Sequence, residues 1–149
     1  VYKEKAPHFT IDVKACLTDE TYSNQVLDWV MTNIESEFAP LVYATADATA
    51  LKAIQREFGA QASSHAVEQF FSHLAIKLQQ HGVKNFIVAG GETSGVVTQS
   101  LSVKGFHIGP QIAPGVPWVK SVEGELSLAL KSGNFGDEDF FAKAQSYFV

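Results

Sequence analysis

The sequence is poor in cysteine and in basic residues. Cys16 is the only cysteine among 149 residues, which excludes an internal disulfide and favours a reducing, cytoplasmic setting. No activating neighbour surrounds Cys16, so we expect an inert thiol. Lys and Arg number 11 against 16 Asp and Glu, and the net charge of −5 predicts no broad basic face for nucleic acid. No apolar run approaches membrane-spanning length, and no secretion signal is present, so we expect no membrane partner.

Methionine is also scarce. The only methionine is Met31, and the chain starts at Val1. This predicts a fragment or a processed product of a longer protein, whose missing part could hold half of the chemistry. A length of 149 residues with 46% hydrophobic residues is that of one ordinary domain, 1–149, with a real core.

A short apolar run followed by two glycines dominates the second half of the chain. Ile87 and Val88 predict a strand that is covered on both faces. Gly90 and Gly91 come directly afterwards, and residues without a Cβ allow a sharp turn and the close approach of a ligand. This pattern favours a phosphate site, although a strand followed by two glycines is often only a tight turn.

The residues after the glycines predict the start of a helix. Thr93 or Ser94 is expected to cap it by accepting a hydrogen bond from a free amide. Free amides and the positive end of the helix dipole suit phosphate. Glu92 has two interpretations that do not exclude each other: a solvated acid of the first turn, or a carboxylate that faces a ribose hydroxyl or Mg²⁺.

A second glycine loop follows the last predicted strand. The strand covers residues 126–131, the loop runs from Ser132 to Gly136, and Gly136 or Asp137 opens a final helix. The two loops could converge on one ligand if their strands are neighbours. Lys131 could supply a positive charge for phosphate or end the strand in solvent, and Asn134 is interpreted as a turn residue.

Strands and helices alternate along most of the chain, which predicts an α/β domain with a mostly parallel central sheet. Asp47 is interpreted as a helix cap in preference to a ligand contact. His65, His73 and His81 lie eight residues apart on one predicted helix, about 12 Å apart along its axis, so we expect no metal site. The expected strands are 9–13, 41–45, 86–89, 106–110 and 126–131, and residues 111–117 are an expected loop. The first expected helix runs from 18 or 19 to about 38, the second from 47 to about 58, and the third from 63 or 64 to about 82.

With both glycine loops identified, the sequence resembles the C-terminal nucleotide-binding domain of the four-carbon acid sugar kinases, the 3-oxo-tetronate kinase family. The matching stretches run in the family's order over almost the whole chain and most strongly over its second half. They are Val88-Ala89-Gly90-Gly91-Glu92-Thr93-Ser94-Gly95, Ile108-Gly109-Pro110 with Ile112-Ala113-Pro114-Gly115-Val116-Pro117-Trp118, and Leu128-Ala129-Leu130-Lys131-Ser132-Gly133-Asn134-Phe135-Gly136 with Asp139-Phe140-Phe141.

The resemblance implies ATP-dependent phosphorylation of a four-carbon acid sugar on its terminal hydroxyl, in carbohydrate metabolism. It places nucleotide-binding positions at Gly90, Gly91, Glu92 and Thr93 in the first loop and at Gly133 in the second. Phosphoryl transfer depends on positioning and charge neutralisation, so Mg²⁺ is expected as a cofactor beside ATP.

The resemblance also implies a partner domain. The family carries its acid-sugar site and its catalytic base on an N-terminal domain and a Ser-rich nucleotide-contacting loop upstream of Val1, so no catalytic residue is expected within 1–149. A three-layer α/β domain without its first strand–helix unit is therefore expected, and the chain alone is expected to be inactive.

Two other functions compete with the kinase interpretation. The same loops could hold a nucleotide or a phosphosugar in a binding module without catalysis. A dinucleotide-dependent oxidoreductase is disfavoured, because the loop at Gly90 lacks G-x-G-x-x-G spacing and no ribose-binding acid lies near Ile112. A P-loop is disfavoured as well, since no Gly-Lys-Ser/Thr sequence occurs.

Overall fold

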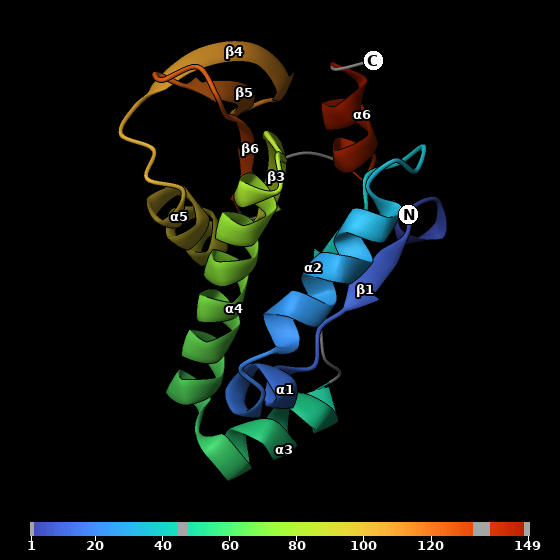
Figure 1. Ribbon diagram of the computed structural model, residues 1–149, viewed down its shortest axis with the longest axis vertical. Helices are drawn as coiled ribbons and strands as arrows, with labels where there is room; N and C mark the ends of the chain where they lie inside the picture. Colours follow the sequence, from blue (N-terminus) through green and yellow to red (C-terminus); the bar gives the residue numbers. More distant parts are fainter. Residues whose placement is uncertain (1, 45–47, 133–137, 148–149) are drawn as a thin grey trace.

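The computed structural model describes residues 2–44, 48–132 and 138–147. Figure 1 shows an elongated molecule in which the longest helix, α4, leads from α3 towards the strand β3. In chain order the elements are η1 (Tyr2–Glu4), β1 (His8–Thr10), α1 (Val13–Thr18), α2 (Tyr22–Asn33), β2 (Leu41–Tyr43), α3 (Ala48–Phe58), α4 (Ala60–Gln80), β3 (Asn85–Ala89), α5 (Gly91–Ser100), β4 (Phe106–Ala113), β5 (Val116–Ser121), β6 (Ser127–Lys131) and α6 (Phe140–Ser146).

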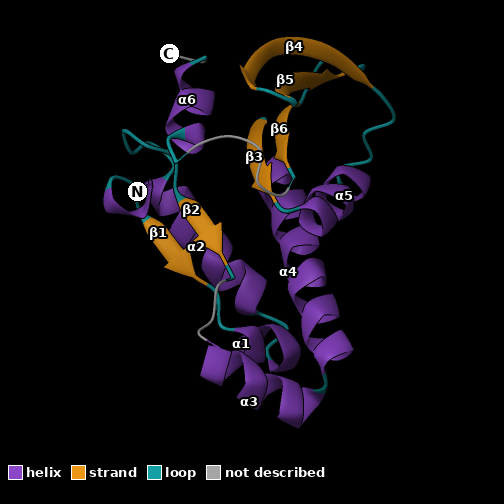
Figure 2. Ribbon diagram, turned by 180° about the vertical axis from the view of Figure 1, so that it is seen from behind, coloured by secondary structure: helices purple, strands orange, loops and turns teal. Residues whose placement is uncertain are grey.

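The described strands form two sheets (Figure 2). β1 and β2 pair in parallel, and the second sheet has the order β3-β6-β5-β4. Within the second sheet β3 and β6 are parallel, whereas β5 is antiparallel to both of its neighbours. Helices therefore combine with parallel and mixed sheets, which confirms the α/β class.

Helices cover both faces of the second sheet. Leu128 of β6 packs in one hydrophobic cluster with Ala75 of α4 and Val97 of α5. Ala129, the next residue of β6, packs in another cluster with Phe140 of α6. Because successive residues of a strand point to opposite faces, the sheet lies between α4 and α5 on one side and α6 on the other. This arrangement is consistent with the expected three layers.

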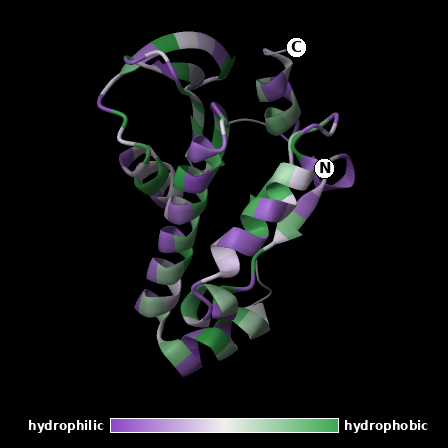
Figure 3. Ribbon diagram, viewed as in Figure 1, coloured by the Kyte–Doolittle hydropathy of each residue, from purple (hydrophilic) through white to green (hydrophobic). Residues whose placement is uncertain are grey.

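The helix α4 joins the core of the second sheet to that of the first. Phe70 and Leu74 are buried in a cluster with α2 and Ile11. Phe71 and Leu78 border both this cluster and the cluster that contains Leu128 of β6. Figure 3 shows hydrophobic and hydrophilic residues alternating along α4, as a helix with one buried stripe requires. The buried residues of this stripe include Phe70 and Leu74.

A polar network ties the start of the chain to α6. The Tyr2 hydroxyl donates to the Ala39 carbonyl at 2.7 Å and accepts a hydrogen bond from the Gln145 amide. Gln145 also accepts from the Ala39 amide at 2.9 Å. Burial raises the pKa of Tyr2, and the hydrogen bond from Gln145 opposes that effect in part. Residues more than a hundred positions apart in sequence are thereby held together.

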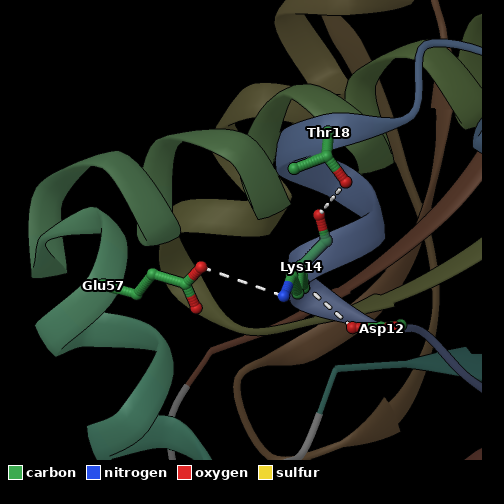
Figure 4. A network of polar contacts seen from close by, with 4 residues as sticks. All are labelled: Asp12, Lys14, Thr18 and Glu57. Atoms are coloured by element: carbon green, nitrogen blue, oxygen red, sulfur yellow. Dashed lines mark hydrogen bonds and ion pairs between the residues drawn. The ribbon is translucent and has the colours of Figure 1, made fainter.

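The first strand is shorter than predicted, because a helix starts where its last residue was expected. Asp12 accepts a hydrogen bond from the Lys14 amide at 2.9 Å and so caps α1. Figure 4 shows this cap, the bond from Thr18 to the Lys14 carbonyl and the exposed pair of Lys14 with Glu57 at 3.8 Å. Such an exposed ion pair contributes little to stability. The cap outweighs the alternating pattern that suggested a strand as far as Val13.

Two helix boundaries also differ from the prediction. The helix expected from Thr18 or Asp19 to Phe38 is α2, Tyr22–Asn33, and Asp19 accepts from the amide and the hydroxyl of Thr21 just before it. The longest helix begins at Ala60, three residues before Ser63, because Gly59 at φ 87° ends α3. The Ser63 hydroxyl then donates back to the Gly59 carbonyl at 2.8 Å instead of capping the helix.

The expected loop 111–117 is a hairpin. β4 and β5 pair antiparallel and are joined by Pro114 and Gly115, with Gly115 at φ 79°. Pro110 lies in β4, an edge strand, and Pro117 lies opposite Gln111 at an irregularity of the pairing. Edges and bulges are the places where a sheet tolerates proline. The expected loop therefore covers the end of β4, the turn and the start of β5, while the strand expected at 106–110 is part of β4.

Candidate functional site

The strand–glycine–helix junction forms as predicted at the end of β3. Gly90 has φ 106° and ψ 131°, a conformation that only glycine adopts readily, and α5 begins at Gly91. The cap of α5 is Gly90 itself, without a side-chain hydrogen bond. The expectation that Thr93 or Ser94 caps this helix is therefore wrong, because the positive φ of Gly90 turns the chain into the helix three residues earlier.

The first amides of α5 are unpaired. The first hydrogen bond of the helix runs from the Ser94 amide to the Gly90 carbonyl at 2.9 Å. Within the described part of the chain nothing accepts from the amides of Gly91, Glu92 and Thr93. Three free N–H groups at the positive end of a helix dipole have the geometry to which anions such as phosphate bind in proteins.

The end of β6 lies directly beside this turn. Ala89 faces Lys131 in the parallel register, and the Gly90 amide donates to the Lys131 carbonyl at 2.8 Å. A Cβ on Gly91 would lie 3.4 Å from the hydroxyl oxygen of Ser132. The condition for convergence of the two loops, neighbouring strands, is thus met. Gly133 and Asn134, predicted in the second loop, lie outside the described residues, as do Thr45, Asp47 and Asp137.

Hydroxyl groups surround the glycine turn. A Cβ on Gly90 would lie 3.5 Å from the Thr93 hydroxyl oxygen, so this side chain lies against the turn. Ser94 is buried, at 9% exposure, and its hydroxyl has no hydrogen-bond partner. The sequence pattern predicts no binding role for Ser94 or Ser132, because the burial of Ser94 depends on the helix start and the closeness of Ser132 to Gly91 depends on the pairing of β6 with β3.

Glu92 is exposed in the first turn of α5 and borders the longest helix. With the first turns of α4, including Gln61, His65 and Glu68, it lines an open hollow of about 680 Å³. This contribution of α4 is absent from the sequence prediction, because α4 and α5 are brought together only by the packing of the sheet. The hollow offers polar groups next to the free amides at the start of α5.

Metal sites and nucleophilic centres draw on histidine and cysteine side chains. The described residues contain no group of three or more side chains placed to hold a metal ion. Burial, followed by the charge of Asp12, raises the pKa of the Cys16 thiol to about 12. The thiol is therefore protonated at neutral pH, as the prediction of an inert cysteine requires. In the described ranges, every helix is too short or too polar to cross a membrane.

Comparison with known proteins assigns the chain to a family. Residues 1–141 match the family described as a nucleotide-binding C-terminal domain. The chain belongs to this family. Two relatives of this domain, both named 3-oxo-tetronate kinase, come from Haemophilus influenzae and Salmonella typhimurium and are 60% and 55% identical over 99% of the chain. The resemblance to the C-terminal domain of the four-carbon acid sugar kinases is confirmed.

Solved structures show the same fold for the nucleotide-binding C-terminal domain. A crystal structure from Haemophilus influenzae has a TM-score of 0.93 at 59% identity, over 99% of this chain and 36% of that one. One from Salmonella typhimurium, described as a tRNA synthase, has a TM-score of 0.91 at 55% identity, with the same shares. The chain also spans 36% of the length of the two curated relatives.

Proposed function

We propose that the chain is the ATP-binding domain of a kinase that converts 3-oxo-tetronate to 3-oxo-tetronate 4-phosphate. The observation that carries the proposal is the row of free amides at Gly91, Glu92 and Thr93 beside the end of β6, in a member of a nucleotide-binding family. The names of the relatives support a four-carbon acid sugar as the phosphate acceptor. The net charge of −5 gives this domain no excess of positive charge for binding a tRNA.

In this proposal each site residue has a defined role. The amides after Gly90 hold phosphate oxygens, and Gly133 lets the second loop pass close to the nucleotide. Mg²⁺ binds phosphate oxygens together with one or two carboxylates, and it neutralises charge during transfer. Glu92 is the acid of the first turn of α5, so its exposed carboxylate suits hydrated Mg²⁺ or a ribose hydroxyl.

We also propose that the rest of the reaction machinery lies in a second domain. The chain spans about a third of the length of the relatives that carry the kinase name. An N-terminal substrate domain would then supply the acid-sugar contacts and the catalytic base. No catalytic residue is assigned within 1–149.

A turnover assay tests the kinase function. The full-length protein is incubated with Mg·ATP and a panel of four-carbon sugar acids, and release of ADP is followed with a coupled enzyme. We expect ADP release that depends on one of the acids. Absence of turnover with every acid, in a protein that binds ATP, would support the alternative of a non-catalytic nucleotide-binding module.

Calorimetric titration of Mg·ATP tests whether residues 1–149 bind ATP without the rest of the protein. Residues 1–149 and the full-length protein are titrated in parallel. Binding by both would show that the two loops suffice for ATP. Binding by the full-length protein alone would mean that an upstream segment completes the pocket, and binding by neither would contradict the proposal.

A further inference from the structure

The buried hydroxyl of Ser94 is the feature of α5 that the fold does not explain. Its oxygen is the one buried side-chain polar atom without a hydrogen-bond partner among the residues that the structure describes. Other hydroxyls of the same helix donate to the carbonyl four residues earlier: Thr98 to Ser94, and Ser100 to Val96, both at 2.7 Å. Such back-bonding is the usual solution for a helical serine or threonine. Ser94 does not adopt it, and a buried hydroxyl without a partner lowers stability.

By helix geometry, the side chain of Ser94 lies on the same face of α5 as Gly91 and leans towards the start of the helix. It follows Gly91 by three residues, so the two positions lie about 60° apart on one face of the helix. This face is turned towards the end of β6, because a Cβ on Gly91 would lie 3.4 Å from the Ser132 hydroxyl. Helical side chains lean towards the N-terminus. Gly91 has no side chain to fill the space over which Ser94 leans.

The surroundings of Ser94 favour an anion as the missing partner. The free amides of Gly91, Glu92 and Thr93 lie one turn earlier on the helix, at its positive end. A hydroxyl is itself a hydrogen-bond donor and can add to the donors of these amides. We propose that Ser94 donates a hydrogen bond to a phosphoryl oxygen of the nucleotide held at the start of α5. This inference rests on the proposed function and adds a binding residue to it.

Two serines of α5 provide a matched pair of variants. Ser94→Ala removes a hydroxyl that has no partner in the free protein, so the melting temperature should stay the same or rise. Its affinity for Mg·ATP should fall about 10- to 100-fold, the equivalent of one hydrogen bond to a charged group. Ser100→Ala removes a hydroxyl that bonds to both Ser72 and the Val96 carbonyl. That variant should melt at a lower temperature and bind Mg·ATP like the wild type.

The experiment measures binding of Mg·ATP and of adenosine to the full-length protein by calorimetry, together with melting curves without ligand. We expect Ser94→Ala to lose affinity for Mg·ATP only. Equal losses for ATP and adenosine, or a lowered melting temperature, would show a structural role and overturn the inference.

Gly91→Val separates the inference from the proposed function. If Gly91→Val fails to bind Mg·ATP while Ser94→Ala binds it like the wild type, the anion site stands and the role of Ser94 is refuted. If the wild type does not bind Mg·ATP at all, the proposed function fails and the inference fails with it.

Discussion

Two glycines of α5 that lie four residues apart should respond in opposite ways to substitution. A Cβ on Gly95 would have nothing within 4 Å, and Gly95 has no left-handed backbone conformation. Gly95→Ala should therefore raise the free energy of unfolding by about 0.5–1 kcal/mol, since alanine loses less backbone entropy in a helix. For a chain of this length the melting temperature should rise by about 1–4 °C.

Substitution of Gly91 should instead affect the ligand. A Cβ there would lie 3.4 Å from the Ser132 hydroxyl, an ordinary contact, but the branches of valine would extend further between this hydroxyl and the free amides. Gly91→Val should raise the Kd for Mg·ATP at least about tenfold, because each hydrogen bond to a charged group contributes about 1.5–3 kcal/mol. The free energy of unfolding should change by less than about 1 kcal/mol, as for a substitution without burial or strain.

The assay combines melting curves with calorimetric titration of Mg·ATP for wild type, Gly91→Val and Gly95→Ala. We expect lost affinity without lost stability in the first variant, and gained stability without lost affinity in the second. Wild-type affinity in a folded Gly91→Val protein would refute the anion site at this turn. Equal loss of affinity in both variants would refute it too, because the effect would then belong to the whole helix.

Further predictions concern the turn, the core and the thiol. Gly90→Ala forces a side chain into φ 106° and should cost about 1–3 kcal/mol of stability, seen as a lower melting temperature; an unchanged one would contradict the strained turn. Trp118→Phe removes the bond from the indole N–H to the Ala144 carbonyl at 2.9 Å and should cost about 1–3 kcal/mol in urea denaturation, because a buried carbonyl loses this donor; an unchanged denaturation midpoint would contradict it. With a pKa of about 12, Cys16 in the folded protein should react slowly with an aromatic disulfide at pH 8, and its rate should rise as the pH approaches 12. In urea the thiol should react fast. Fast labelling of the folded protein at pH 8 would contradict the burial of Cys16.

The local parts of the site could be predicted from the sequence. Ile87 and Val88 followed by Gly90 and Gly91 specify a strand, a turn and a helix within a few residues, and the structure has all three. The prediction failed where a serine or threonine can either cap a helix or lie inside it. Thr93 or Ser94 was expected as a cap, but both lie inside the helix and Ser94 is buried, because Gly90 already supplies the turn.

The assembly of the site could not be predicted from the sequence. More than thirty residues separate Ala89 from Lys131, and only the pairing of β3 with β6 brings the two loops to one edge of the sheet. The hairpin of β4 and β5 lies between them in the chain, and its prolines concealed it. The proposed substrate rests on the family resemblance and on the names of the relatives, and on no physical feature of these residues.

The amide resonances of Gly91, Glu92 and Thr93 give the most direct test of the anion site. Their ¹H–¹⁵N signals are followed by NMR while the protein is titrated with Mg·ATP. If these N–H groups hold the phosphates, they should show the largest shifts, with the protons moving downfield, while the amides of α3 stay in place. Saturation with Mg·ATP that leaves these signals unmoved would contradict the proposed site.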